Sequence, residues 1–274
     1  MEQGQSLRRL VIIAKGRLLP VCPRNLVPRG CASSAVTGSS GSPHICATRA
    51  SGMQDFLVQD PAIVNSMKAS LSGPRFARYL SVTGGDDRKA LALYQWNALI
   101  SQSLYVYIQC WEICLRNKVD GFLRWKYSEK WPYDQNRAVR NLQGNDRKRL
   151  LETISRQHSQ RGFSPVSTDS IVADLSAGFW VSQLSKSYAV PYVWNYNLVK
   201  IFPNDTALNT RAAWEICDRT LNLRNRIAHH EPIYHLDLQQ HYGDLQRIVA
   251  AMCKGTSAFA NANSSFRHVF ESKP

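Results

Sequence analysis

Apolar residues recur at helical spacing along most of the chain from Met53 onward. Between residues 84 and 127, positions three, four or seven apart form one stripe, and Asp86 and Asp87 stand where they complement the positive end of a helix dipole. This stretch predicts a central helix of about 40 residues, roughly 60 Å long if unbroken, that supports the other helices. The stripe consists of Tyr94, Ala98, Ser101, Tyr105, Ile108, Leu115, Val119 and Phe122.

Shorter segments show the same periodicity and carry residues that start or stop helices. Asp60 and Pro61 suit the N-cap and the first position of one helix, and Gly162 suits the end of another, strongly basic one. No run alternates with a period of two between turn signals, so the pattern predicts an all-α fold, a helical bundle with one long central helix. The expected helices cover residues 60–72, 144–162, 167–185 with Ser167 or Asp169 as N-cap, 205–230 and 237–253, with a proline-bounded connection at 191–205.

The first 52 residues differ from the rest in composition. They contain no Phe, Tyr or Trp, and seven basic residues stand against the single acid Glu2. Such a segment buries too little apolar surface to offset chain entropy, so a disordered basic tail is expected at 1–52. It fits a transit peptide, but the favoured interpretation is a reading frame extended upstream of a start at Met53. One helical domain is then expected at 53–255, followed by a flexible C-terminus at 256–274.

Net charge narrows the range of partners. Lys and Arg number 34 against 20 Asp and Glu, and the formal charge of +14 favours polyanions, which leaves RNA, DNA and anionic membranes open. The seven cysteines form no CxxC pair and are odd in number, so we expect reduced thiols in a cytoplasmic protein. Because no apolar run approaches the ~18 residues of a membrane span, no membrane insertion is expected.

The segment LRNRIAHHEPI at residues 223–233 concentrates polar residues at the expected end of a helix. At 100° per residue, Asn225 and His229 lie about one turn apart, so the amide can orient the imidazole. Arg224 lies about 140° from His229 on an ideal helix. This conflict disappears if the helix unwinds after Ala228, as the nearby proline encourages, or if a second copy of the chain supplies the facing residues. One face comprises Leu208, Ala212, Ile216, Leu223 and Ile227, and the opposite face Arg211, Glu215, Asp218, Asn222, Asn225 and His229.

These residue types suit cleavage of RNA without a metal. Histidine, with a pKa of about 6.5, can move the 2′-hydroxyl and leaving-group protons, and an arginine fork can hold the charge that grows on phosphorus. The same residues can also simply complement the helix dipole and cap its last carbonyls. No metal site is expected, because His229 and His230 are adjacent and cannot both bind an ion from one helix face.

The residues RNRIAHHEPI resemble the signature of the abortive-infection (Abi-like) proteins of the HEPN superfamily of helical RNases, an Arg followed after four to six residues by a His. Arg224, Asn225 and His229 match this pattern with four intervening residues. The likeness covers most of residues 74–250. Three further blocks are similar, in the same order, to those that precede the motif in the family: residues 93–117, 174–185 and 200–204.

The resemblance implies a HEPN-type domain that acts as a homodimeric, metal-independent endoribonuclease without a cofactor, in phage defence or as a toxin. His229 is expected to be the general base or acid, Arg224 to stabilise the phosphorane, Asn225 to orient His229, and His230 to serve a second proton transfer. The products are expected to carry 2′,3′-cyclic phosphate ends. The expected partners are RNA, a second copy of the chain, and an antitoxin or a phage-derived trigger.

A second polar cluster lies in the central segment, where EICLRN places Glu112 four residues before Arg116, with Asn117 next. It is interpreted either as a structural ion pair or as a set of residues that support the motif. The basic stretch 144–162 fits either a solvated face or a contact with an RNA backbone.

Two other functions fit the same residues. One is a non-catalytic RNA-binding or regulatory protein of the same superfamily, and the other is a helical scaffold that senses a phage component. Facing Arg224 and His229 side chains in a basic cleft would favour the enzyme, and a buried motif would favour the scaffold.

Overall fold

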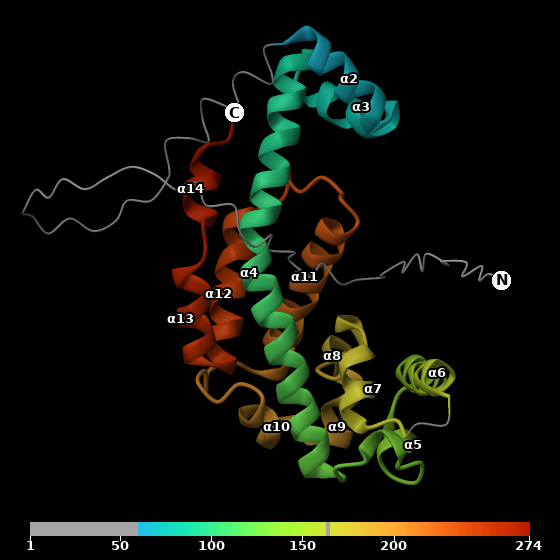
Figure 1. Ribbon diagram of the computed structural model, residues 1–274. Helices are drawn as coiled ribbons and strands as arrows, with labels where there is room; N and C mark the ends of the chain where they lie inside the picture. Colours follow the sequence, from blue (N-terminus) through green and yellow to red (C-terminus); the bar gives the residue numbers. More distant parts are fainter. Residues whose placement is uncertain (1–59, 163–164) are drawn as a thin grey trace, which may run out of the picture. The chain divides into compact units, whose positions relative to one another are not determined.

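A computed structural model describes residues 60–162 and 165–274, and these residues form an all-α fold (Figure 1). Helices are the only regular secondary structure in these two ranges, as the sequence predicted. The expected tail at 1–52 and the proposed start at Met53 lie outside the described residues. Within the described part of the chain, every helix is too short or too polar to cross a membrane.

The central helix is α4, Asp87–Lys126, with 40 residues (Figure 1). The Asp86 carboxylate caps it by accepting hydrogen bonds from the second and third backbone amides of the helix, at 2.9 and 3.1 Å. The C-terminal half of the predicted stripe is buried, but Ala98 and Tyr105 are exposed. Buried residues lie on several sides of α4 because other helices pack around it, so a single stripe does not describe its core contacts.

The other helices follow the predicted order. The Asp60 side chain accepts a hydrogen bond from the Ala62 amide at 2.8 Å and so caps the first helix, and the basic helix ends at Gly162, which has φ +60°. The main helices are α2 (Pro61–Leu71), α3 (Gly73–Val82), α6 (Gly144–Arg161), α7 (Thr168–Asp174), α8 (Ala177–Ser182), α11 (Thr210–Ala228) and α12 (Leu238–Met252). The short ones are η1 (Trp131–Tyr133), α5 (Ala138–Asn141), η2 (Lys186–Tyr188), α9 (Ala189–Tyr192), α10 (Trp194–Asn197) and η3 (Leu198–Lys200).

Three segments differ from the prediction. α3 was not predicted, and the connection at 191–205 contains short helices. Of the two N-caps expected for residues 167–185, Ser167 and Asp169, the structure has Ser167, whose hydroxyl accepts from the Ser170 amide at 3.2 Å. Residues 167–185 then form two helices instead of one, because the backbone is extended between α7 and α8. Both helices bury apolar side chains, Ile171 and Val172 from α7 and Phe179 and Trp180 from α8.

The last residues are helical and packed, so the expected flexible C-terminus at 256–274 is wrong. Two helices end the chain, α13 (Lys254–Ala262) and α14 (Phe266–Glu271). Phe266 is buried, and its ring stacks on Tyr242 of α12 with the centroids 4.2 Å apart. The Trp96 indole of α4 donates a hydrogen bond to the Val269 carbonyl at 2.8 Å. These contacts join distant parts of the sequence, so local periodicity does not report them.

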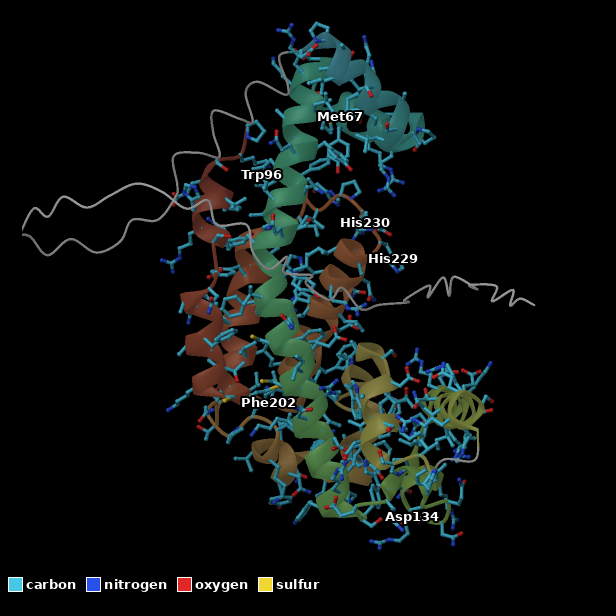
Figure 2. The ribbon with its side chains drawn as sticks, in the orientation of Figure 1. Met67, Trp96, Asp134, Phe202, His229 and His230 are labelled. Carbon is cyan, nitrogen blue, oxygen red and sulfur yellow. The ribbon has the colours of Figure 1, made fainter. Side chains whose placement is uncertain are left out.

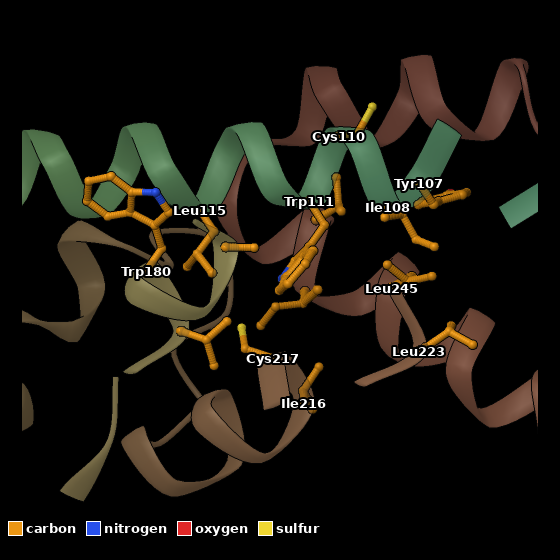
Figure 3. Packing of buried hydrophobic residues seen from close by; sticks show 14 of the residues in the cluster. Tyr107, Ile108, Cys110, Trp111, Leu115, Trp180, Ile216, Cys217, Leu223 and Leu245 are labelled. Carbon is orange, nitrogen blue, oxygen red and sulfur yellow. The ribbon is translucent and has the colours of Figure 1, made fainter. Parts of the chain in front are cut away.

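One core joins α4 to α8, α11 and α12 (Figure 3). Trp111 and Leu115 of α4 lie between the other helices, and both are almost completely buried. This core fixes α11 against the middle of α4 and therefore fixes the motif at the end of α11. The other helices contribute Trp180, Ile216, Cys217, Leu223 and Leu245.

Candidate active site

α11 carries the motif, and its two faces follow the sequence pattern. The Asn209 side chain caps the helix by accepting a hydrogen bond from the Ala212 amide at 2.9 Å. On the opposite face, Arg211 and Glu215 form an exposed ion pair at 2.8 Å. The predicted apolar residues are buried or pack against the core, namely Leu208, Ala212, Ile216, Leu223 and Ile227.

The helix ends at Ala228, one of the two arrangements that the sequence left open. The His230 amide donates to the Ile227 carbonyl at 3.0 Å, and the Glu231 amide donates to the Arg226 carbonyl at 2.8 Å. Together with a left-handed His230 at φ +56°, these two bonds form a Schellman motif, which stops a helix. His230 therefore has a structural role that residue spacing did not reveal.

Both imidazoles of the motif stand at this helix end. His229 and His230 are exposed, on the side of α4 that also carries α3 (Figure 2). The two imidazoles are therefore accessible, whereas Arg224 and Asn225 are half-buried, and no hydrogen bond of the described residues joins Arg224 to His229. Neither the facing pair that would favour the enzyme nor the buried motif that would favour the scaffold is shown.

The segment after the motif is anchored to α4 by Asn97. Its side-chain oxygen accepts hydrogen bonds from the backbone amides of Ile233 and Tyr234, at 2.7 and 3.1 Å. Asn97 is buried, and so is Ile233. Because one amide side chain satisfies two successive backbone donors, the path of the chain beyond His230 is fixed.

Arg224 reaches across to the central helix. Its Nε donates to a carboxylate oxygen of Glu112 at 3.1 Å, with the two side chains 27 % and 33 % exposed. Ion pairs this exposed contribute at most ~1 kcal/mol to stability, so the main consequence of the pair is orientation of the guanidinium. Glu112 thus contacts the motif, as the second interpretation of its cluster proposed.

Other residues expected at the site are arranged differently. The Asn225 side-chain oxygen accepts from Arg224 Nη1 at 3.4 Å, and no hydrogen bond within the described residues joins it to the His229 imidazole. The expected orientation of His229 by Asn225 therefore stays a prediction that no hydrogen bond of the described residues supports. Arg116 donates to its neighbour Asn117 at 3.2 Å instead of pairing with Glu112. Neither Arg116 nor Asn117 contacts the motif through a hydrogen bond or ion pair in the part of the chain that the structure describes.

Sequence reasoning missed two residues beside the motif, Asn97 and Arg75. Arg75 of α3 donates from Nη1 to the His230 carbonyl at 3.5 Å, across 155 positions of sequence. Asn97 reaches Ile233 across 136 positions. Both are single polar residues in ordinary helical surroundings, so no local signal distinguishes them.

The two cavities of the described residues lie away from the motif, and no group of metal ligands is found among these residues. An open cavity of about 1060 Å³ is lined by residues between 189 and 211, and another of about 420 Å³ lies beside Tyr242 and His268. Neither is lined by residues 223–233, so the motif sits on an exposed helix end rather than in one of these hollows. Within residues 60–162 and 165–274, no three His, Cys, Asp or Glu side chains are grouped to hold a metal ion.

Comparisons of this chain with protein-family models, with curated proteins and with solved structures gave no match. The resemblance to Abi-like proteins therefore rests on the motif and on the three blocks that precede it.

Proposed function

We propose that this chain is a metal-independent endoribonuclease of the HEPN type, active as a homodimer in the cytoplasm in phage defence or as a toxin. The observation that carries the proposal is the end of α11, where Arg224 is held by Glu112 while His229 and His230 are exposed just beyond the helix. An oriented cation and two accessible imidazoles are the kinds of group that metal-free RNA cleavage requires. Control by an antitoxin or a phage-derived trigger belongs to the same proposal.

The reaction begins with attack of the RNA 2′-hydroxyl on the adjacent phosphorus. His229 takes the hydroxyl proton or protonates the leaving 5′-oxygen, and His230 serves the other transfer. The bond from phosphorus to O2′ forms and the bond to O5′ breaks, which leaves a 2′,3′-cyclic phosphate and a 5′-hydroxyl. Arg224 stabilises the charge on the phosphorane, and Glu112 keeps its guanidinium in place.

A second copy of the chain completes the site in this proposal. Arg224 points to α4, where it pairs with Glu112, and no hydrogen bond within the described residues links its side chain to His229. A two-fold axis that passes the exposed helix ends would place Arg224 of one protomer opposite His229 of its partner.

The proposal is tested by RNA cleavage with Arg224→Ala and His229→Ala. Wild-type protein should cut RNA in excess EDTA, leave 2′,3′-cyclic phosphate ends and not cut DNA, which has no 2′-hydroxyl. Each variant should lose ~10²-fold to ~10⁴-fold in rate, the usual contribution of a positioned acid or base. Both side chains are at least partly exposed, so the variants should keep the wild-type melting temperature.

His268→Ala is the matched control, since His268 is also exposed but lies on α14. It should retain full activity. Cleavage that stops in EDTA would contradict the metal-free mechanism, and unfolding of both site variants would assign Arg224 and His229 to structure.

Non-catalytic RNA binding is the second candidate function. It is favoured because two residues of the motif already have structural roles. His230 ends the helix, and Arg224 is neutralised by Glu112, so neither requires catalysis to explain it. In that case wild-type protein would bind RNA without cutting it, and His229→Ala would leave binding unchanged.

A further inference from the structure

We propose that Arg75 and Arg78 of α3 bind the phosphodiester backbone of RNA beside the cleavage site. The choice of RNA rests on the proposed function, but the surface itself is defined by the structure. Both side chains are exposed and lie one helical turn apart.

α3 is held rigidly against the segment that follows the motif. The Tyr234 hydroxyl donates to the Arg78 carbonyl at 3.0 Å, and the Tyr234 and Tyr79 rings lie 5.2 Å apart between centroids. Tyr79 is buried. The Arg75 contact with the His230 carbonyl, at 3.5 Å, lies at the same junction. A phosphate bound at Arg75 would therefore lie next to the exposed imidazoles rather than at a distant face.

The positive charges of these two arginines are not neutralised by an acidic side chain in the described part of the chain. Within residues 60–162 and 165–274 neither guanidinium forms an ion pair. Arg75 stands in the first turn of α3, which contains no acidic residue, and a cation there opposes the helix dipole. Burial raises the pKa of Tyr79, and the positive charges of Arg75 and Arg78 oppose that rise.

An RNA backbone matches this arrangement better than an isolated small anion does. Two cations one turn apart follow a chain of phosphates, and Arg offers a planar fork to phosphate oxygens. Arg224 and Arg226 of the motif, in contrast, are paired with Glu112 and Glu231. Arg75 and Arg78 of α3 therefore supply cations without an acidic partner within the described residues, and they position the substrate while the motif performs the chemistry.

The test measures binding of a fluorescent 2′-O-methyl RNA, whose blocked 2′-oxygen prevents cleavage, by anisotropy over a range of salt concentrations. Arg75→Ala and Arg78→Ala should each weaken binding several-fold and reduce the salt slope by roughly 0.7, the value for one lost contact on a single strand. Arg267→Ala is the control, because Arg267 is an exposed, unpaired arginine of α14, within the described residues. It should change neither quantity. Arg75→Gln and Arg78→Gln repeat the test if an alanine variant melts earlier.

Cleavage assays separate this inference from the proposed function. If both hold, Arg75→Ala and Arg78→Ala raise KM several-fold and leave kcat at saturating RNA unchanged. If wild-type protein cuts no RNA but the two variants bind RNA more weakly and with a smaller salt slope, the RNA-binding role of α3 is supported and the proposed nuclease activity is contradicted. Normal cleavage with unchanged affinity in both variants would overturn the inference, as would an equal loss in Arg267→Ala.

Discussion

At the residue scale, the motif combines backbone geometry with acid–base chemistry. His230 occupies a left-handed conformation that stops α11, and its imidazole is nevertheless exposed. Among residues with a side chain, histidine enters this region more readily than most, whereas β-branched residues do so rarely. One residue therefore serves the helix end through its backbone and is free to serve the proposed reaction through its ring.

These two roles can be separated by substitution at His230. Glycine adopts the left-handed conformation without strain, so His230→Gly should be about 1 kcal/mol more stable than His230→Ala in urea unfolding. Equal stability of the two variants would mean that the left-handed conformation stores no strain. Cleavage by the glycine variant then reports on the imidazole alone, and full activity would remove His230 from the chemistry.

At the scale of elements, capping and periodicity predicted most helices. Asp60 is the predicted cap, Ser167 is one of the two caps that the sequence offered, and Asp86 lies at the helix start where its charge was expected. α11 buries the face that its spacing indicated. The error at the C-terminus has a physical cause, which is stabilisation by tertiary contacts. α14 depends on Phe266 stacking against Tyr242, and a local pattern in the sequence does not contain that contact.

The same limit applies to the candidate site. The motif and its exposed helix end were predicted from short-range spacing, because residues close in sequence are close on a helix. The pairing of Arg224 with Glu112, 112 positions away, was one of several options that spacing allowed. Asn97 and Arg75 were not identified, since only the fold brings them to the motif.

The Asn97 contact predicts a measurable loss of stability. Asn97→Ala leaves the buried Ile233 amide and the adjacent Tyr234 amide without their acceptor, which should cost ~1 to ~3 kcal/mol in urea unfolding. Gln102→Ala is the control, since Gln102 is an exposed amide on the same helix. If Asn97→Ala unfolds at the wild-type urea concentration, the two hydrogen bonds do not anchor the segment.

The packing of α12 against α11 predicts a dependence of stability on pH. Burial lowers the pKa of His241 below its ordinary value of 6.5; Asp244 and Asp237 oppose this shift, and Arg219 adds to it. Between the lowered pKa and 6.5, the unfolded chain binds more protons than the folded one, so stability falls as pH decreases through this window.

His241→Gln removes this titration. The free energy of unfolding of the variant should therefore fall less steeply as pH decreases, by a slope that corresponds to a fraction of one bound proton. The slope of the unfolding free energy against pH is measured by urea unfolding at several pH values between about 5 and 7, the range in which an ordinary histidine titrates. An identical slope in the variant would show that His241 is not responsible for it.

At the scale of the whole molecule, α4 holds the motif at two points. Glu112 binds Arg224 before the helix end, and Asn97 binds Ile233 after it. These two residues of α4 are 15 positions apart, about 22 Å along a helix. α11 and the segment beyond it are thus both attached to α4, so the exposed helix end is held on the two sides by one helix. An exposed surface held in this way suits assembly with a second copy, as the proposed dimer requires.

If the site is shared between protomers, two inactive variants should complement each other. In a mixed dimer of Arg224→Ala and His229→Ala, one site contains both wild-type residues and the other contains neither. Random pairing makes half of the dimers mixed, so co-expressed variants should recover about a quarter of wild-type cleavage, whereas each variant alone stays inactive. If both residues instead act within one chain, every site in the mixed dimer carries one lesion and no activity returns. Light scattering of the same samples must show dimers, because a monomer with full activity would exclude the shared site altogether.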